Sequence, residues 1–215
     1  MRDYPEVEWD VDRQFRFQKS EYPTFPDSLQ EFYDNRVSDS RQAYFQELAQ
    51  LEPEIFLSLS VMLLLMIGVF KKNSEILVYN LSTIILLILL ALVINLFSIN
   101  EIFIFNESYK IDTLSTFMKS LTIIAAIFVM ISSFTYLKSL DILKIEYPIL
   151  ILSSILGMMI MISSNDIIVF YLGLELQSLA LYVLASFNRD NLLSSESGLK
   201  YFVLSALSSG LLLYG

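Results

Sequence analysis

Residues 76–100 read ILVYNLSTIILLILLALVINLFSIN and carry no charged side chain over 25 positions. A helix rises about 1.5 Å per residue, so about 20 apolar residues cross the roughly 30 Å hydrocarbon core of a bilayer. This stretch is therefore long enough and apolar enough to span a membrane. A buried helix of a soluble protein is the alternative, and the rest of the chain decides between the two.

Further apolar stretches surround this one, at residues 55–70, 113–137, 147–165, 167–188 and 197–215. Two are free of charge, and the other three contain one charged residue each, namely Lys119, Glu175 and Lys200. A soluble protein with six such stretches in succession would be rare. We therefore expect an all-α integral membrane protein with about six transmembrane helices.

The residue inventory excludes several kinds of site. The 215 residues include no Cys and no His. This rules out disulfides, zinc–thiolate and iron–sulfur ligation, haem ligation by imidazole and a His-based triad. The formal net charge of −9 argues against nucleic acid as a partner. We expect no cofactor, metal or redox chemistry on this chain.

The acidic residues concentrate at the N-terminal end. Residues 1–54 hold 13 of the 23 acidic and 6 of the 14 basic side chains. An N-terminal segment this acidic is unlike a mitochondrial transit peptide, which is rich in Arg. We divide the chain into an acidic polar extension (1–53), transmembrane helices 1–3 (54–146) and transmembrane helices 4–6 (147–215).

Six spans would place the connecting loops alternately on two sides of the membrane. One side receives the basic residues Lys71, Lys72, Lys138, Lys144 and Arg189. By the positive-inside rule, this is the cytoplasmic or matrix side. The acidic extension is then expected on the outer side.

Glu175 lies near mid-depth in its span, as the ninth residue of 167–187. An ionised carboxylate there costs roughly 3 kcal/mol on insertion scales, which selects against idle acids. Tyr171 precedes it at i−4, and Ser178 and Tyr182 follow at i+3 and i+7. The four residues therefore form a polar stripe that should face a protein or water-filled interior. Glu175 is thus a candidate proton-handling group, with a carboxylate held by fixed hydrogen bonds as the alternative.

The two lysines within spans are weaker candidates. If the last span begins near Ser195, Lys200 lies about five residues inside it and could either snorkel to the interface or take part in function. Glu196, one turn earlier, could pair with it. Lys119 lies six or seven residues into its span and is expected to snorkel.

Residues 165–215 also resemble a known family. The segments LELQSLALYVLA around Glu175, ESGLKYFVLSALSSG around Lys200 and the closing LLLYG are similar to chain 2 of NADH–ubiquinone oxidoreductase. That family comprises antiporter-like subunits in the membrane arm of respiratory complex I. A looser likeness, PEIFLSLSVMLLLMIGVF at 53–70, resembles its first helix.

The resemblance implies a fold and two site residues. The family has about fourteen transmembrane helices with two inverted five-helix repeats, so this chain would be the first part of a fourteen-helix antiporter-like fold. Glu175 takes the place of the essential glutamate on the fifth helix, and Lys200 that of the sixth-helix lysine, both for proton translocation. The seventh- and eighth-helix lysines have no counterpart in the 215 residues.

The resemblance further implies a membrane-arm role in proton-translocating NADH:ubiquinone oxidoreductase, with NADH, FMN, iron–sulfur clusters and ubiquinone on other subunits. Expected partners are other membrane-arm subunits, membrane lipids and, if the subunit is split, a second chain whose helices dock on the face of Ser205, Ser209 and Gly210. Residue usage suits an AT-rich organelle genome, hence a mitochondrial inner membrane with the tail in the intermembrane space. The alternatives are a purely structural membrane-arm fragment and a cation/proton antiporter outside complex I.

Overall fold

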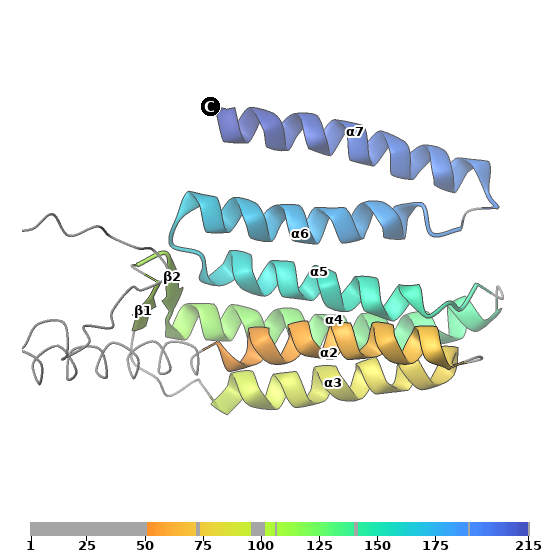
Figure 1. Ribbon diagram of the computed structural model, residues 1–215, viewed down its shortest axis with the longest axis horizontal. Helices are drawn as coiled ribbons and strands as arrows, with labels where there is room; N and C mark the ends of the chain where they lie inside the picture. Colours follow the sequence, from red (N-terminus) through yellow and green to blue (C-terminus); the bar gives the residue numbers. More distant parts are fainter. Residues whose placement is uncertain are drawn as a thin grey trace, which may run out of the picture. The chain divides into compact units, whose positions relative to one another are not determined.

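The computed structural model describes residues 51–71, 74–95, 102–105, 107–139, 142–188 and 190–214. The acidic extension predicted at 1–53 falls almost wholly outside these residues. The described part consists of six long helices and one short β-hairpin (Figure 1). Their bounds are α2 Glu52–Phe70, α3 Glu75–Asn95, β1 Ile102–Ile104, β2 Tyr109–Ile111, α4 Thr113–Ser139, α5 Glu146–Ser163, α6 Ile167–Ala185 and α7 Leu192–Tyr214.

Five of these helices, α2 to α6, are long and apolar enough to cross a bilayer. The sixth, α7, has 23 residues and so has the length, but it is not among the five. Its first half carries Ser194, Ser195, Glu196, Ser197 and Lys200, which lower its mean hydropathy. The predicted all-α membrane class is confirmed, and α7 is the most polar of the six helices.

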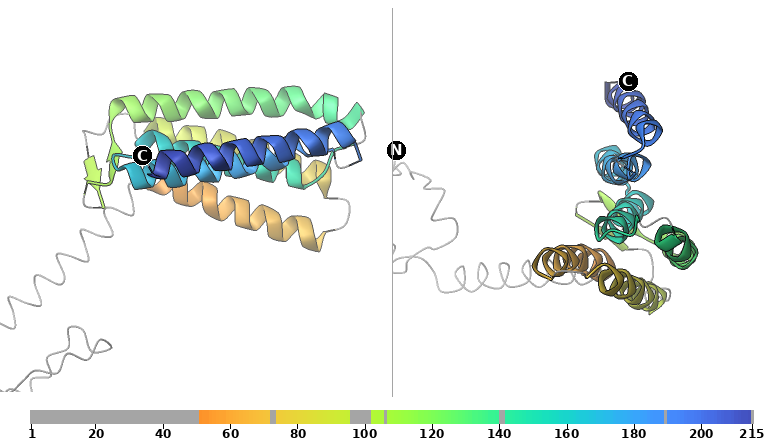
Figure 2. Two further views of the ribbon diagram at one scale, coloured as in Figure 1. Left: turned by 90° about the horizontal axis from the view of Figure 1, so that it is seen from above. Right: turned by 90° about the vertical axis from the view of Figure 1, so that its right-hand side faces the viewer.

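The helices α2, α3, α4 and α5 pack around a common apolar core. Figure 2 shows them end-on as one group, with α6 and then α7 added on the side of α5. Core side chains from all four helices are almost fully buried, among them Leu57, Leu64, Leu86, Leu89, Ile123, Met130, Leu152, Ile155 and Met159. Within the described part, α7 packs chiefly against α6.

The connection between α3 and α4 contains an antiparallel hairpin of β1 and β2. Ile102 pairs with Ile111 and Ile104 with Tyr109. The turn between the strands uses positive φ at Phe105 (52°) and Glu107 (69°), which is uncommon for residues other than glycine. The alternating IFI and YKI sequences place one side of the hairpin, including Ile104 and Tyr109, in a small apolar cluster.

The hairpin is fastened to the connection between α5 and α6. The Asn165 backbone N–H donates to the Ser108 carbonyl oxygen at 3.0 Å, and the Asn165 side-chain amide donates to the Glu107 carbonyl oxygen at 2.7 Å. Figure 1 shows this connection and the hairpin at one end of the helices, and the α2–α3, α4–α5 and α6–α7 connections at the other. The alternation expected from the sequence is therefore present; Lys72 and Arg189 lie outside the described residues.

Candidate functional site

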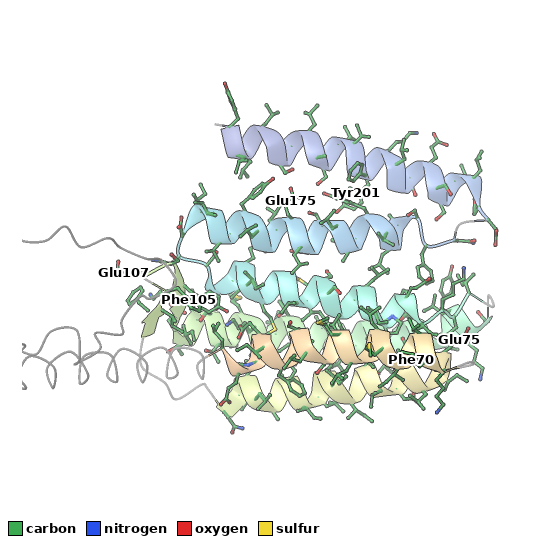
Figure 3. All side chains as sticks on the ribbon, in the orientation of Figure 1. Phe70, Glu75, Phe105, Glu107, Glu175 and Tyr201 are labelled. Carbon is green, nitrogen blue, oxygen red and sulfur yellow. The ribbon has the colours of Figure 1, made fainter. Side chains whose placement is uncertain are left out.

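The predicted polar stripe lies on α6, a largely apolar helix. Asp166 begins the helix by accepting a hydrogen bond from the Ile168 backbone N–H at 3.3 Å. Glu175 is the ninth of its 19 residues and is therefore at the middle of the helix. Glu175 is half-buried, and its side chain lies on the side of α6 that faces α7 (Figure 3).

The stripe continues along the contact between α6 and α7. Ser178 and Tyr182 are buried, and the Tyr182 hydroxyl donates a hydrogen bond to the Ser205 hydroxyl oxygen on α7. The Tyr182 ring also meets Tyr201 and Phe202 edge-on, with ring centroids 5.0 and 5.6 Å apart. The stripe thus faces a protein neighbour, as its spacing predicted.

The Glu175 carboxylate has no partner among the described side chains. The Ser178 hydroxyl is occupied within its own helix, where it donates to the backbone oxygens of Leu174 (2.7 Å) and Glu175 (3.1 Å). The ion pairs that join described residues are Lys110–Asp112, Lys119–Glu54 and Lys200–Glu196. No cation of the described helices therefore pairs with Glu175.

The Lys200 ammonium does not pair with the Glu175 carboxylate. It is the ninth residue of α7, deeper in its helix than expected, because α7 begins at Leu192. Its ammonium lies 2.6 Å from the Glu196 carboxylate, which confirms the predicted i,i+4 pair. The two side chains are 66% and 49% exposed within the described part of the chain. A role for Lys200 in proton movement stays a prediction.

A second charged cluster, which the sequence did not reveal, joins α2, α4 and β2. The Lys119 ammonium donates to Glu54 Oε1 at 2.6 Å, and the Tyr109 hydroxyl donates to the same oxygen at 2.8 Å. Lys119 also lies 3.2 Å from the Tyr109 hydroxyl oxygen. The side chains of Lys119 and Glu54 are only 6% and 8% exposed. The expectation that Lys119 snorkels is wrong, because its ammonium pairs with a carboxylate inside the bundle.

A sequence signal for this ion pair did exist. Glu54 is the third residue of α2 and Lys119 the seventh of α4, and both helices start at the same end of the bundle. Opposite charges at similar depth in two spans are candidates for pairing. Tyr109 could not be found this way, since its position depends on the hairpin.

Tyr109 acts as a fixed donor in this cluster. Burial first, and then the negative charge of Glu54, raise the pKa of its phenol far above the usual tyrosine range, while the Ser163 hydroxyl opposes the shift. The phenol therefore keeps its proton at any physiological pH. Among the described residues, no group of three or more His, Cys, Asp or Glu side chains could hold a metal ion.

Comparison with known proteins bears on the helices that carry Glu175 and Lys200. Residues 164–215, which include α6 and α7, match the family described as NADH:quinone oxidoreductase/Mrp antiporter, TM. This is the segment whose motifs suggested the family.

Relatives of known name match a longer part of the chain. NADH-quinone oxidoreductase subunit N of Pelagibacter ubique is 66% identical over 163 residues, which are 76% of this chain and 35% of that protein. The subunit N of Maricaulis maris is 50% identical over 171 residues, covering 79% and 35%. The chain thus spans about a third of the length of these relatives.

A solved structure shares the fold. A chain of respiratory complex I from Thermus thermophilus, solved with bound aureothin, superposes with a TM-score of 0.64 at 23% identity. The match covers 75% of this chain and 35% of that one. The motifs around Glu175 and Lys200, the match over residues 164–215 and these relatives make the chain similar to antiporter-like membrane subunits such as NADH-quinone oxidoreductase subunit N.

Proposed function

We propose that this chain is part of a membrane-arm, antiporter-like subunit of a proton-translocating NADH:quinone oxidoreductase, in which Glu175 handles protons. The observation that carries the proposal is a half-buried carboxylate at the centre of an apolar helix, on the face turned to α7. Acids at such depth are costly and rarely idle. The relatives' names support the setting.

In this proposal Glu175 exchanges a proton as the charge of a neighbouring group changes. A nearby ammonium favours the ionised carboxylate, and loss of that positive charge favours uptake of a proton. The hydroxyl of Tyr182, which belongs to the stripe, already shares a hydrogen bond with the Ser205 hydroxyl on α7. Lys200 is retained as a candidate second group, one turn after Glu196 and next to Tyr201.

The missing ammonium would come from helices beyond those described. The side of α7 that α6 does not cover is apolar and exposed, as at Leu204, Leu207 and Leu211. A Cβ at Gly210 would have open space around it. These features support further helices packing on α7. These helices could belong to a second chain, as expected for a split subunit. A continuation of the same polypeptide would pack on the same face of α7.

The remaining partners are proposed from the family. The other subunits of the complex would hold NADH, FMN, iron–sulfur clusters and the quinone, and this chain would contact them within the membrane arm. Membrane lipids would cover exposed side chains such as Met62, Leu63 and Phe128. These apolar side chains on α2 and α4 support a lipid-facing surface.

The compartment and orientation are likewise proposals. The basic residues Lys71, Lys138 and Lys144 lie at the end opposite the hairpin, which supports an outward-facing hairpin and N-terminal tail. A mitochondrial inner membrane rests on residue usage alone, whereas the relatives named above are bacterial. A bacterial cytoplasmic membrane accommodates the same topology. Protease cleavage of the tail only from the cytoplasmic or matrix side would contradict the orientation.

The family description also includes Mrp antiporters, which supports a cation/proton antiporter as the second candidate function. Purification of the full chain from its native membranes separates the two. Co-purifying subunits with iron–sulfur clusters would support the oxidoreductase, and their absence from an intact assembly would support the antiporter.

The proton role is tested by Glu175→Gln in native membranes. Glutamine keeps the shape of the side chain and removes its titratable proton. We expect normal assembly and a marked loss of proton translocation, measured with a pH-sensitive dye in sealed vesicles. Glu107→Gln, in the exposed hairpin turn, is the matched control and should change nothing. Unchanged translocation in an assembled Glu175→Gln variant would favour the purely structural alternative.

A further inference from the structure

The helices α5 and α6 meet backbone to backbone at two glycines. A Cβ added at Gly157 would lie 2.6 Å from the backbone nitrogen of Gln177 and 2.8 Å from the carbonyl oxygen of Gly173. A Cβ added at Gly173 would lie 2.8 Å from the backbone nitrogen of Met161 and 2.9 Å from the carbonyl oxygen of Gly157. Real Cβ atoms essentially never come this close to other atoms. Because the atoms in the way are backbone, alanine at either position must move one helix relative to the other.

This contact determines where Glu175 points. An α-helix turns by about 100° per residue, so Glu175 lies about 200° around the helix from both Gly173 and Gln177. Those two residues face α5. Glu175 therefore faces away from α5, which is the side on which α7 lies (Figure 3). The height and rotation of α6 at the glycine contact thus set the height and rotation of the carboxylate.

Resting on the proton role proposed for Glu175, we propose that Gly157 and Gly173 are positioning residues, which set the depth and direction of the Glu175 carboxylate at the α6–α7 contact. The contact on the other face of α6 leaves little tolerance for displacement. There the Tyr182 hydroxyl reaches Ser205, and its ring packs against Tyr201 and Phe202. A shift of α6 away from α5 changes the surroundings of Glu175 on both sides.

Another helix glycine in the chain provides a matched control. A Cβ at Gly68 on α2 would lie 2.6 Å from Ile145 Cγ2, so a side chain and not a backbone atom must give way. The same glycine-to-alanine change at this position therefore crowds the structure without forcing the α5 and α6 backbones apart.

The test compares Gly157→Ala and Gly173→Ala with Gly68→Ala in the full chain in its native membranes. Two quantities are measured per assembled complex, namely the infrared band of the protonated Glu175 carboxyl and the pH profile of proton translocation. The band is assigned by its loss in Glu175→Gln. We expect the first two variants to shift the band and the pH profile and to lower the rate by up to about 100-fold. The control variant should leave the band and the pH profile unchanged.

The outcomes are distinct. Reduced assembly with an unchanged band and pH profile per assembled complex would overturn the positioning role and leave only a packing role. If Glu175→Gln translocates normally, the proposed function fails, and the band shift still decides whether the glycines position the carboxyl group.

A second measurement applies if the alanine variants do not insert. The chain has no native cysteine, so Leu172→Cys, Glu175→Cys and Leu179→Cys each introduce one thiol. Leu172 and Leu179 are exposed on α6. A lipid-soluble maleimide should label them several times faster than position 175. Equal labelling of position 175 would show that it does not face α7 and would overturn the proposal.

Discussion

Two glutamates within the helices are treated very differently by the same fold. Glu54 lies near the start of α2, is 8% exposed and shares one carboxylate oxygen with the Lys119 ammonium and the Tyr109 hydroxyl. Glu175 lies at the middle of α6, is half-buried and has no described partner. A charge whose partners all come from the chain itself is suited to holding helices and hairpin together. A carboxylate without such a partner is suited to responding to a charged group that arrives from elsewhere.

The largest expected effect is on the paired glutamate. Lys119→Met keeps the length of the side chain and removes its charge, which leaves the Glu54 carboxylate buried and unpaired. Breaking a buried pair in this way costs about 3–5 kcal/mol. We expect a loss of this size in the free energy of unfolding of the full chain in lipid–detergent micelles. Lys71→Met, at an exposed lysine, is the control and should cost less than about 0.5 kcal/mol.

The double variant Glu54→Gln/Lys119→Met sharpens the same comparison. Glutamine removes the charge and still offers Tyr109 a carbonyl oxygen. Replacing both members of a buried pair is often close to neutral, so most of the lost stability should return. A double-mutant cycle measures this coupling. If the two substitutions simply add, the pair is not the reason for the burial of Lys119.

The spans and the polar stripe could be predicted because both depend on local sequence. Length and hydropathy identify a membrane helix, and helical spacing places Ser178 and Tyr182 on the face of Glu175. The start of α7 was predictable in principle, since the Asn191 side chain accepts from the Leu193 backbone N–H at 3.0 Å. The pairing of Lys119 with Glu54 could be predicted only as a candidate from their similar depth, because the actual partner depends on which helix lies beside α4.

The hairpin and the glycine contact depend on non-local geometry as well. The strands of the hairpin pair only three residues each, and they are held by hydrogen bonds from Asn165 on a distant connection. Gly157 and Gly173 lie 16 positions apart and carry no signal until α5 and α6 are laid side by side. The absence of a described mate for Glu175 follows from the same cause, since its surroundings are set by tertiary packing.

A smaller effect is expected at Asp112, an acid outside the membrane. Its carboxylate accepts from the Ser115 backbone N–H at 2.7 Å at the start of α4. This bond lowers its pKa below the usual 3.8; burial opposes the shift, and Lys110 adds to the lowering. The stability that it contributes is therefore present above about pH 4 and is lost as the pH falls through the lowered pKa of the folded state.

We expect Asp112→Ala to cost about 1 kcal/mol at pH 7, the usual value of a helix cap. The difference from the unsubstituted chain should shrink as the pH falls through the lowered pKa of Asp112. Asp112→Asn keeps an oxygen acceptor and is the control, with a smaller cost and no dependence on this titration. A difference that persists unchanged at acid pH would show that the cap does not depend on the charge.

The smallest effect on stability is expected at Lys200, whose pairing resembles neither glutamate above. Its ion pair with Glu196 is exposed and one helical turn long, so it contributes at most about 0.5 kcal/mol. Lys200→Met should therefore leave the free energy of unfolding almost unchanged. Any loss of proton translocation in that variant then reports on the charge itself and not on folding. Glu196→Gln separates a role of the ammonium from a role of the ion pair, because it frees the ammonium without removing it. If both variants lower translocation equally, the pair acts as a unit. If only Lys200→Met lowers it, the ammonium acts alone.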